Sequence, residues 1–372
     1  MSAPRDLEPG PPPHLSGSYL VVELTNRCSL ACVHCSVAEA GHGHHQTTGY
    51  LDPALYQALI EDLVDVGARF DALIPFWLGE PLLHPQFSWM WRLGLRAAAR
   101  HQTFGQIEVH TNATHLTPDR VRVLLNDGDV PCVFHLSIDA ATAETYLPIK
   151  GMDRFDKVEA NVLHLLAEKG RTGARWPRPV FQFIVGSNNA HEVGAFRARW
   201  EAACLAAGLP VRAAAGHVPA GEDAVVFFRQ LDCPTPAEQE AENEVFRQAM
   251  AAEGLPLPEQ SARGERVEAS NLAACSGFWK SPVVHWQGDV TTCTRDSLLA
   301  NSVGTLREHR FRELWWGGLM GTRRAQVAEG DYTGLALCRT CFIPRSLNHA
   351  DLDTGDVAAQ AAWQEAAWSA ER

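Results

Sequence analysis

The segment Cys28-Ser-Leu-Ala-Cys32-Val-His-Cys35 follows directly on the apolar run Tyr19-Leu-Val-Val-Glu-Leu24. Three thiols this close in sequence can converge on one small inorganic centre without any long-range folding. A structural zinc site uses four protein ligands, whereas a cluster iron that lacks a cysteine keeps an open coordination position. The spacing of three residues and then two also differs from the cysteine pairs of zinc ribbons and thioredoxin-type motifs. The segment therefore predicts a cluster with one open iron, with three buried or redox-inert cysteines as the alternative.

The composition of the chain narrows its class and its partners. The 372 residues are 46% hydrophobic and 20% charged, which is typical of a soluble globular protein with a substantial core. The net charge of −12 argues against nucleic-acid binding, and no apolar segment is long enough to cross a bilayer. Because the N-terminus lacks the features of a signal peptide, we predict a cytoplasmic protein whose ten cysteines are reduced thiols or metal ligands.

Short apolar runs alternate with amphipathic segments over the first two thirds of the chain. Strand-like runs lie at 19–24, 72–78, 106–110, 132–138, 179–185 and 210–214. Helix-like stretches lie near 52–67, 86–100, 117–126, 153–168 and 190–207. This alternation predicts parallel strands with crossover helices, in either a doubly wound sheet or an incomplete barrel. Candidate site residues follow four successive strands (Cys28, Glu80, Asn112, and Ser137 with Asp139), which suits the mouth of a barrel better than a single switch point.

The three-cysteine segment resembles the CxxxCxxC signature of the radical S-adenosylmethionine (SAM) enzymes. The resemblance implies a partial (β/α)6 TIM-like barrel over residues 19–214 and a [4Fe–4S] cluster with SAM at Cys28, Cys32 and Cys35. It also implies reductive cleavage of SAM to a 5′-deoxyadenosyl radical that abstracts a substrate hydrogen. His34 stands where the family usually has an aromatic ring that packs on the cluster.

Further segments resemble the parts of this family that contact SAM. The implied contacts are Gly79, Glu80, Asn112, Ser137, Lys150 and Ile184. Leu78 replaces the first glycine of the family's Gly-Gly-Glu-Pro, Ala113 replaces the glycine of Thr-Asn-Gly, and Lys150 stands where arginine is frequent. Each position also has a purely structural interpretation, as a turn, a local cap or core packing, and Asp139 could equally cap the helix near Thr142.

A second cysteine group, Cys275, Cys293, Cys338 and Cys341, lies near the C-terminus. Four soft ligands suit either a structural zinc ion or an iron–sulfur cluster. A hairpin pattern around Gly288-Asp289 separates the first two cysteines from the CxxC pair, and this order resembles the auxiliary-cluster domains called SPASM and twitch. Since no cysteine follows Cys341, the resemblance implies a single auxiliary [4Fe–4S] cluster of twitch type, similar to the 2-deoxy-scyllo-inosamine dehydrogenases.

The remaining segments divide the chain further. We expect a disordered proline-rich lead at 1–18, a linker or insertion with a helix at 215–270, the auxiliary domain at 271–345, and a C-terminal helix and tail at 346–372. The histidines in 41–45 receive no role. Cys132 and Cys204 are interpreted as core residues, whereas Cys233 is either an incidental loop cysteine or a hydrogen-atom donor to a substrate radical.

The favoured function is oxidation or epimerisation of a small hydroxylated metabolite, such as an aminocyclitol or sugar, with a flavodoxin or ferredoxin as the one-electron donor. The auxiliary cluster would then accept the second electron. One alternative is modification of a ribosomal peptide by epimerisation or cross-linking. The other is a non-catalytic, zinc-braced interaction protein with a degenerate barrel.

Overall fold

The protein is described here by a computed structural model that covers residues 10–35, 47–233, 235–257, 274–341 and 354–369. The first half of the predicted proline-rich lead, the histidines at 41–45, the linker around 261–266 and the segment 342–353 lie outside the described residues. The domain boundaries predicted at residues 270 and 345 therefore fall outside them as well.

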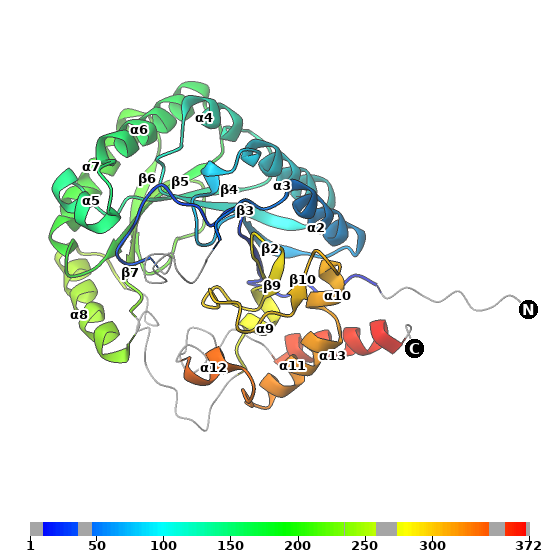
Figure 1. Cartoon of the computed structure of the whole chain (residues 1–372). Coiled ribbons are helices and arrows are strands. Elements are labelled where there is room, and N and C mark those ends of the chain that lie inside the picture. The colour runs from blue at the N-terminus through cyan, green and yellow to red at the C-terminus, as the bar shows by residue number, and fades with distance from the viewer. Residues whose placement is uncertain (1–9, 36–46, 234, 258–273, 342–353, 370–372) are drawn as a thin grey trace, which may run out of the picture.

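One ten-stranded sheet runs through the whole molecule in the order β10-β9-β8-β1-β2-β3-β4-β5-β7-β6 (Figure 1). Its barrel strands are β1 (Tyr19–Val22), β2 (Phe70–Ile74), β3 (Phe104–Thr111), β4 (Cys132–Ser137), β5 (Arg178–Val185), β6 (Val211–Ala215) and β7 (Ala224–Gln230). Every pair among these strands is parallel. The fold is thus a partial TIM-like barrel, as the sequence predicts.

Crossover helices lie around the outside of the curved sheet (Figure 1). They are α2 (Pro53–Asp65), α3 (Phe87–His101), α4 (Pro118–Leu124), α5 (Ala143–Lys150), α6 (Phe155–Thr172), α7 (Val193–Ala206) and α8 (Pro236–Ala252), with short 3-10 turns η1 (Pro81–Leu83) and η2 (Ala190–Glu192). Asp52 and Thr117 cap α2 and α4 from the position before a proline, which fixes where these helices begin.

Alternation along each strand divides the sheet into two faces. In β3, Ile107 and Val109 pack into the main core under the helices. Their neighbours Gln106, Glu108 and His110 are only half-buried and occupy the opposite, inner face. The barrel therefore has an apolar outer layer and an inner face that carries polar side chains toward its mouth.

The segment expected to be a linker contributes a barrel strand. Residues 224–230 form β7, which pairs with β5, while β6 lies at the edge beyond β7. The strand predicted at 210–214 is present as β6, but β7 lies between it and β5. The barrel sheet therefore extends past the boundary predicted at residue 214. The run Ala224-Val-Val-Phe-Phe228 is fully buried and apolar, which is the pattern of an interior parallel strand. The helix expected near 237–253 is present as α8.

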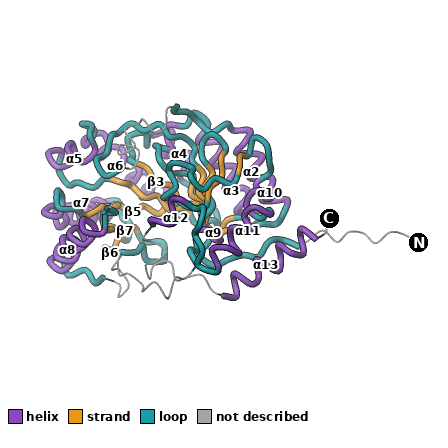
Figure 2. The backbone as a smooth tube through the Cα atoms, turned by 60° about the horizontal axis from the view of Figure 1, so that its bottom comes forward, coloured by secondary structure: helices purple, strands orange, loops and turns teal. Residues whose placement is uncertain are grey.

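The C-terminal region extends the same sheet. It comprises α9 (Gly277–Lys280), β8 (Val283–Val284), β9 (Asp289–Thr291), β10 (Gly304–Thr305), α10 (Phe311–Trp315), α11 (Gly318–Ala328), α12 (Ala336–Thr340) and α13 (Thr354–Ser369). The predicted hairpin is formed by β8 and β9, with Gly288 at φ +102° between them. Strand β8 pairs in parallel with β1, so this region joins the barrel edge, and α9, α11 and α13 lie together at one side of the molecule (Figure 2). None of the described helices has the length and apolar character that a membrane span requires.

Candidate functional site

The loop that carries Cys28, Cys32 and Cys35 leaves β1 at the barrel mouth and rests on the end of α5. Ala31 N donates to Lys150 O at 3.0 Å, and Val33 N donates to Ile149 O at 2.9 Å. Gly151 follows at φ +69°, where a Cβ atom would lie 2.4 Å from Ala31 O, so only glycine permits this contact. The backbone of the cysteine loop is therefore held in place by a separate crossover unit.

The segment after β2 packs directly against the backbone of the cysteine loop. Glu80 N donates to Arg27 O at 2.8 Å, and a Cβ atom at Gly79 would lie 2.1 Å from Thr25 O and 2.6 Å from Arg27 O. Glycine at position 79 is thus required by this close approach, whatever other role it has. The structural interpretation of this turn and the ligand-binding one are compatible.

The Glu80 carboxylate joins the ends of β2 and β3. It accepts hydrogen bonds from Leu82 N at 3.0 Å, Thr111 Oγ1 at 2.8 Å and Asn112 N at 2.7 Å, and the side chain is buried. Burial, opposed by these hydrogen bonds, raises the pKa of Glu80 to about 7. The carboxylate is therefore already engaged in positioning the strand ends that surround the cysteine loop.

Asn112 reaches from the end of β3 to the first cysteine. Its Nδ2 lies 3.6 Å from Cys28 Sγ and 3.3 Å from Ser29 Oγ. The next residue, Ala113, has φ +60°, the left-handed conformation for which the family's glycine is suited. Alanine adopts the same turn here, so its replacement of glycine does not displace Asn112.

Lys150 has a partner that the sequence did not reveal. Its Nζ lies 2.5 Å from Asp139 Oδ2 and 3.4 Å from Ser137 Oγ, and both charged side chains are fully buried. Although burial raises the pKa of Asp139, the Lys150 ammonium and the hydrogen bonds outweigh it and hold this pKa below its usual value. Asp139 does not cap α5, since Thr142 does, and its Oδ1 accepts from Ile184 N at 2.7 Å. Lys150 is therefore a charge that Asp139 already neutralises.

These residues enclose a cavity of about 300 Å³. Its lining includes all three cysteines of the loop and every predicted SAM contact, namely Gly79, Glu80, Asn112, Ser137, Lys150 and Ile184. Among the residues that the sequence analysis did not name are Phe76, His110, Gln182 and Arg229. Desolvation at the cavity, followed by the charge of Glu80, raises the pKa of Cys28 to about 12, although the residue as a whole is exposed.

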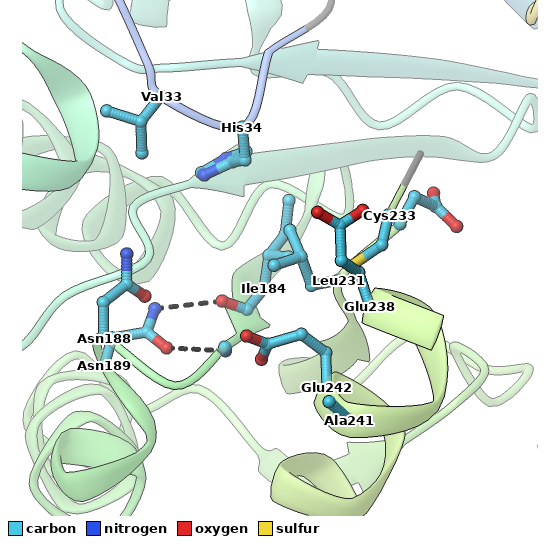
Figure 3. A pocket seen from close by; sticks show the side chains of 12 residues that line it. Val33, His34, Ile184, Asn188, Asn189, Leu231, Cys233, Glu238, Ala241 and Glu242 are labelled. Carbon is cyan, nitrogen blue, oxygen red and sulfur yellow. Dashed lines mark hydrogen bonds between the residues drawn. The ribbon is translucent and has the colours of Figure 1, made fainter. Parts of the chain in front are cut away.

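A second pocket, of about 350 Å³, adjoins the first at the barrel mouth (Figure 3). The two share His34, Ile184, Leu231 and Asp232 in their linings. Helix α8 contributes Glu238, Ala241 and Glu242 to the second pocket. Cys233 is buried and lines this second pocket, not the cavity lined by the three cysteines.

The four C-terminal cysteines gather into a second centre. Burial and then the neighbouring Cys293 raise the pKa of Cys275 to about 12, and Cys338 and Cys341 contribute to the same shift. Among the described residues, no three of the thiols lie within 4.8 Å of one another. Four cysteines supply the four ligands that either a zinc ion or an iron–sulfur cluster requires.

Polar contacts surround this second centre. Asn301 Nδ2 lies 3.2 Å from Cys338 Sγ, and Arg295 N lies 3.4 Å from Cys293 Sγ. Donors of this kind stabilise cluster thiolates and tune the reduction potential of the cluster.

Direct contacts connect the two cysteine centres. Trp77 Nε1, beside the first cavity, donates to Thr294 O, next to Cys293, at 3.0 Å. The buried Glu23 carboxylate accepts from Leu78 N at 3.3 Å and from Trp286 N at 3.1 Å, and lies 3.1 Å from His285 Nε2. Sequence reasoning missed Glu23, although a lone acid within the apolar run 19–24 was a signal that could have identified it.

Comparison with known proteins agrees with this geometry. Residues 22–188 match the family model of the radical SAM superfamily, and residues 275–342 match that of an iron–sulfur cluster-binding domain, SPASM. Mycofactocin maturase MftC from Mycobacterium tuberculosis is 32% identical over 158 residues. The match covers 42% of this chain and only 36% of that relative.

Two solved structures share the fold at low sequence identity. The structure of anSMEcpe with bound SAM and Cp18Cys peptide is 14% identical with a TM-score of 0.54, and covers 96% of this chain and 97% of its own. Streptococcus suis SuiB bound to the precursor peptide SuiA is 11% identical with a TM-score of 0.53, and covers 90% of this chain and 75% of its own.

Proposed function

We propose that this chain, a radical SAM enzyme with a SPASM-type auxiliary cluster domain, modifies a peptide substrate. The observation that carries the proposal is the pair of adjoining cavities of about 300 and 350 Å³, which share four lining residues. With SAM in the inner cavity, an extended substrate would lie in the outer pocket, with its reacting residue beside the four shared lining residues. The named relative is a maturase, and the two solved structures of similar fold hold peptides, which supports the same substrate class.

In this proposal Cys28, Cys32 and Cys35 hold a [4Fe–4S] cluster, and the inner cavity holds SAM against it. When bound, the cluster and SAM supply the 5′-deoxyadenosyl radical chemistry of the family. Gly79 and Glu80 hold the backbone beside the cluster, and Asn112 orients the Cys28 thiolate. Ile184, which lines both cavities, packs against the ligand. Lys150 and Ser137, held by Asp139, form the polar wall.

The second centre has a separate role in the proposal. Cys275, Cys293, Cys338 and Cys341 hold the auxiliary [4Fe–4S] cluster, which transfers electrons or braces the fold. Four thiolates would occupy all of its iron positions, so the substrate binds elsewhere. A flavodoxin or ferredoxin remains the expected one-electron donor to the enzyme.

Oxidation of a small hydroxylated metabolite, which the sequence analysis favoured, has less support. The maturase relative and the two peptide-bound structures of similar fold support a peptide instead. The non-catalytic, zinc-braced alternative is not retained, because residues 22–188 match the radical SAM superfamily model and residues 275–342 match that of an iron–sulfur cluster-binding domain. If Cys233 donates a hydrogen atom, it does so to a substrate that reaches the outer pocket.

The first test concerns the radical chemistry. We expect anaerobically reconstituted protein to cleave SAM reductively and Cys28→Ala to lose this activity with the fold retained. Cys204→Ala is the control, since Cys204 is a core residue of α7. Unchanged 5′-deoxyadenosine production by Cys28→Ala would refute the assignment of the cluster.

The second test concerns the substrate class. Ala241 is an exposed residue of α8 that lines the outer pocket, so Ala241→Trp fills this pocket with little strain, and Ala251→Trp on the same helix is the matched control. We expect a pooled library of short synthetic peptides to stimulate 5′-deoxyadenosine formation, and Ala241→Trp to lower this stimulation by about tenfold, as loss of remote binding contacts does. Stimulation by aminocyclitols or sugars but not by peptides would favour the metabolite alternative.

For Cys233, the Cys233→Ala variant is compared with the wild type on any peptide that reacts. Full product yield in this variant would exclude a hydrogen-donor role. An epimerised product keeps the mass of the substrate, whereas a cross-link or an oxidation lowers it by two hydrogens.

A further inference from the structure

A tryptophan in the wall of the inner cavity is hydrogen-bonded to the region of the second cysteine centre. Trp77 follows β2, is 8% exposed, and lines the cavity that the three cysteines of the loop also line. It belongs to a small apolar cluster against which Cys35 packs. Its indole Nε1 donates to Thr294 O at 3.0 Å, and Thr294 follows Cys293 directly. One side chain of the barrel therefore lies between the two centres.

The carbonyl that accepts this hydrogen bond belongs to a peptide group that also contacts a cysteine of the second centre. The carbonyl of Thr294 and the amide N–H of Arg295 are the two ends of one planar trans peptide group. Arg295 N donates to Cys293 Sγ at 3.4 Å. Since the C=O and N–H of a trans peptide point in opposite directions, the indole bond at one end and the sulfur bond at the other require the same orientation of the group.

The local turn does not fix this orientation by itself. Asp296 N donates to Cys293 O at 3.0 Å, which closes a β-turn with Thr294 and Arg295 at its centre. The Asp296 carboxylate accepts from Asn301 N at 2.8 Å and so anchors the end of the turn. Turn types I and II have the same ends and differ by a rotation of the central peptide group. The indole hydrogen bond restrains that rotation.

A hydrogen bond to a thiolate ligand acts on the reduction potential of a cluster. Reduction adds one negative charge, so a donor at a ligand sulfur favours the reduced form and raises the potential. The indole bond also polarises the peptide group, which strengthens the N–H donor at its other end. Loss of the indole donor frees the rotation and weakens the polarisation, and both effects lower the potential.

We propose that Trp77 is a positioning residue that sets the reduction potential of the auxiliary cluster from the wall of the inner cavity. It acts through the peptide group between Thr294 and Arg295, whose N–H it keeps directed at Cys293 Sγ. The inference rests on the proposed assignment of Cys293 as a ligand of an auxiliary [4Fe–4S] cluster. It does not depend on whether the substrate is a peptide.

The alternative role for Trp77 is packing alone. The indole lies in the apolar cluster with Val21, Leu78 and Val283, and His285 meets it edge-on with a centroid distance of 5.8 Å. Phenylalanine keeps an aromatic ring at this position but has no N–H to donate. The substitution Trp77→Phe therefore separates the hydrogen bond from the packing.

The test is a potentiometric titration of the reconstituted full-length protein with dithionite, followed by EPR spectroscopy. Each reduction adds one electron from dithionite to one cluster, and the auxiliary signal is the one that Cys338→Ala lacks. We expect Trp77→Phe to disfavour the reduced auxiliary cluster by about tenfold, a fall of about 59 mV for one electron, as loss of one hydrogen bond to a charged group does. Trp77→Leu, which also lacks the donor, should lower the potential as well.

Trp176→Phe is the matched control. Trp176 is buried, its Nε1 donates to Gly128 O at 2.9 Å, and it precedes β5, whereas the cavity lies at the C-terminal ends of the strands. This variant should keep the wild-type potential. Iron content and melting temperature show that each variant is loaded and folded.

A wild-type auxiliary potential in both Trp77 variants would overturn the inference, and so would an equal fall in Trp176→Phe. Absence of the auxiliary signal from the wild type would instead refute the cluster assignment on which the inference rests. The two failures are therefore distinguishable, and neither readout requires the substrate to be known.

Discussion

Lys150 and Asp139 form a buried ion pair that the geometry of the SAM cavity depends on. The ammonium and carboxylate are 2.5 Å apart, and the Asp139 carboxylate also accepts a hydrogen bond from Ile184 N of β5. A buried charge that loses its partner is strongly destabilising, whereas loss of both charges together is often tolerated. The pair is thus a better explanation for a lysine at position 150 than direct recognition of SAM.

We therefore expect Lys150→Met to lower the free energy of unfolding by about 3–5 kcal/mol, because Asp139 is left buried and unpaired. Lys150→Met combined with Asp139→Asn should recover part of this loss, since Asn keeps an oxygen for Ile184 N and tolerates the positive φ at this position. Denaturant titrations measure both effects, with the exposed Lys157→Met as control. Equal losses in the single and double variants would contradict the ion-pair account.

Single residues also show what the sequence could predict of the site. The three cysteines and all six predicted SAM contacts do line one cavity, because all of them except Lys150, the last residue of α5, belong to motifs at the end of a strand. The pairing of Lys150 with Asp139 was missed because it depends on how the end of α5 packs against the end of β4, and no local motif indicates that packing. His110, which also lines this cavity, was missed as well. The run 106–110 was interpreted as apolar, and its polar alternation, Gln106, Glu108 and His110, was the signal overlooked.

At the scale of elements, the β2–η1 segment and the cysteine loop act as one unit because of a single glycine. A Cβ atom at Gly79 would lie 2.1 Å from Thr25 O, a backbone atom that cannot rotate away. We expect Gly79→Ala to cost about 1–3 kcal/mol of stability, as overpacking does, and to weaken SAM binding measured by calorimetry on the reconstituted protein. Gly318→Ala, with nothing within 4 Å of the added atom, should change neither property. Wild-type SAM affinity in Gly79→Ala would show that the loops move independently.

Element prediction succeeded where the sequence carried local signals. Capping residues before prolines located α2 and α4, and the hydrophobic runs located the first six strands. The order β5-β7-β6 was not predicted, because apolar content shows that 224–230 is a buried strand but not which strand it pairs with. Helix α5 was predicted only as a start near Thr142 and not in its extent, since it is short and contains Pro148. Pairing between distant segments is a property of the tertiary fold, and this chain gives no local sign of it.

At the scale of the whole molecule, the second cysteine centre belongs to the region that extends the barrel sheet beyond β1. Asn301 lies 3.2 Å from Cys338 Sγ, so this thiol is both a ligand and a hydrogen-bond acceptor in the proposed cluster. We expect Cys338→Ala to lower the iron content from about eight to about four per chain, as loss of one [4Fe–4S] cluster requires. Colorimetric iron and sulfide analysis measures this loss, and Cys204→Ala should keep the full content. Zinc bound at this centre in the wild type would contradict the assignment.

Glu23, directly after β1, connects the regions of the two cysteine centres. Its ionisation should therefore change the free energy of unfolding of the protein. It bonds Leu78 N beside the inner cavity and Trp286 N after β8, and it is fully buried. Burial, opposed by these two hydrogen bonds, raises its pKa from 4.5 to about 8. Between these values the folded state holds one proton more than the unfolded chain. Stability must therefore fall as the pH rises from about 4.5 to about 8, and the loss is complete above pH 8.

Glu23→Gln keeps the shape and the acceptor oxygen but cannot ionise. We expect the difference in unfolding free energy between this variant and the wild type to grow in favour of the variant as the pH rises from 6 to about 8.5, by an amount on the order of a few kcal/mol. Chemical denaturation of the reconstituted protein across this range measures it, with Glu61→Gln, exposed on α2, as the control. A difference that does not change with pH would mean that Glu23 is ionised throughout and that the His285 imidazole, 3.1 Å away, carries the compensating proton. In that case the contact between the barrel and the auxiliary domain would be an ion pair and not a neutral hydrogen bond.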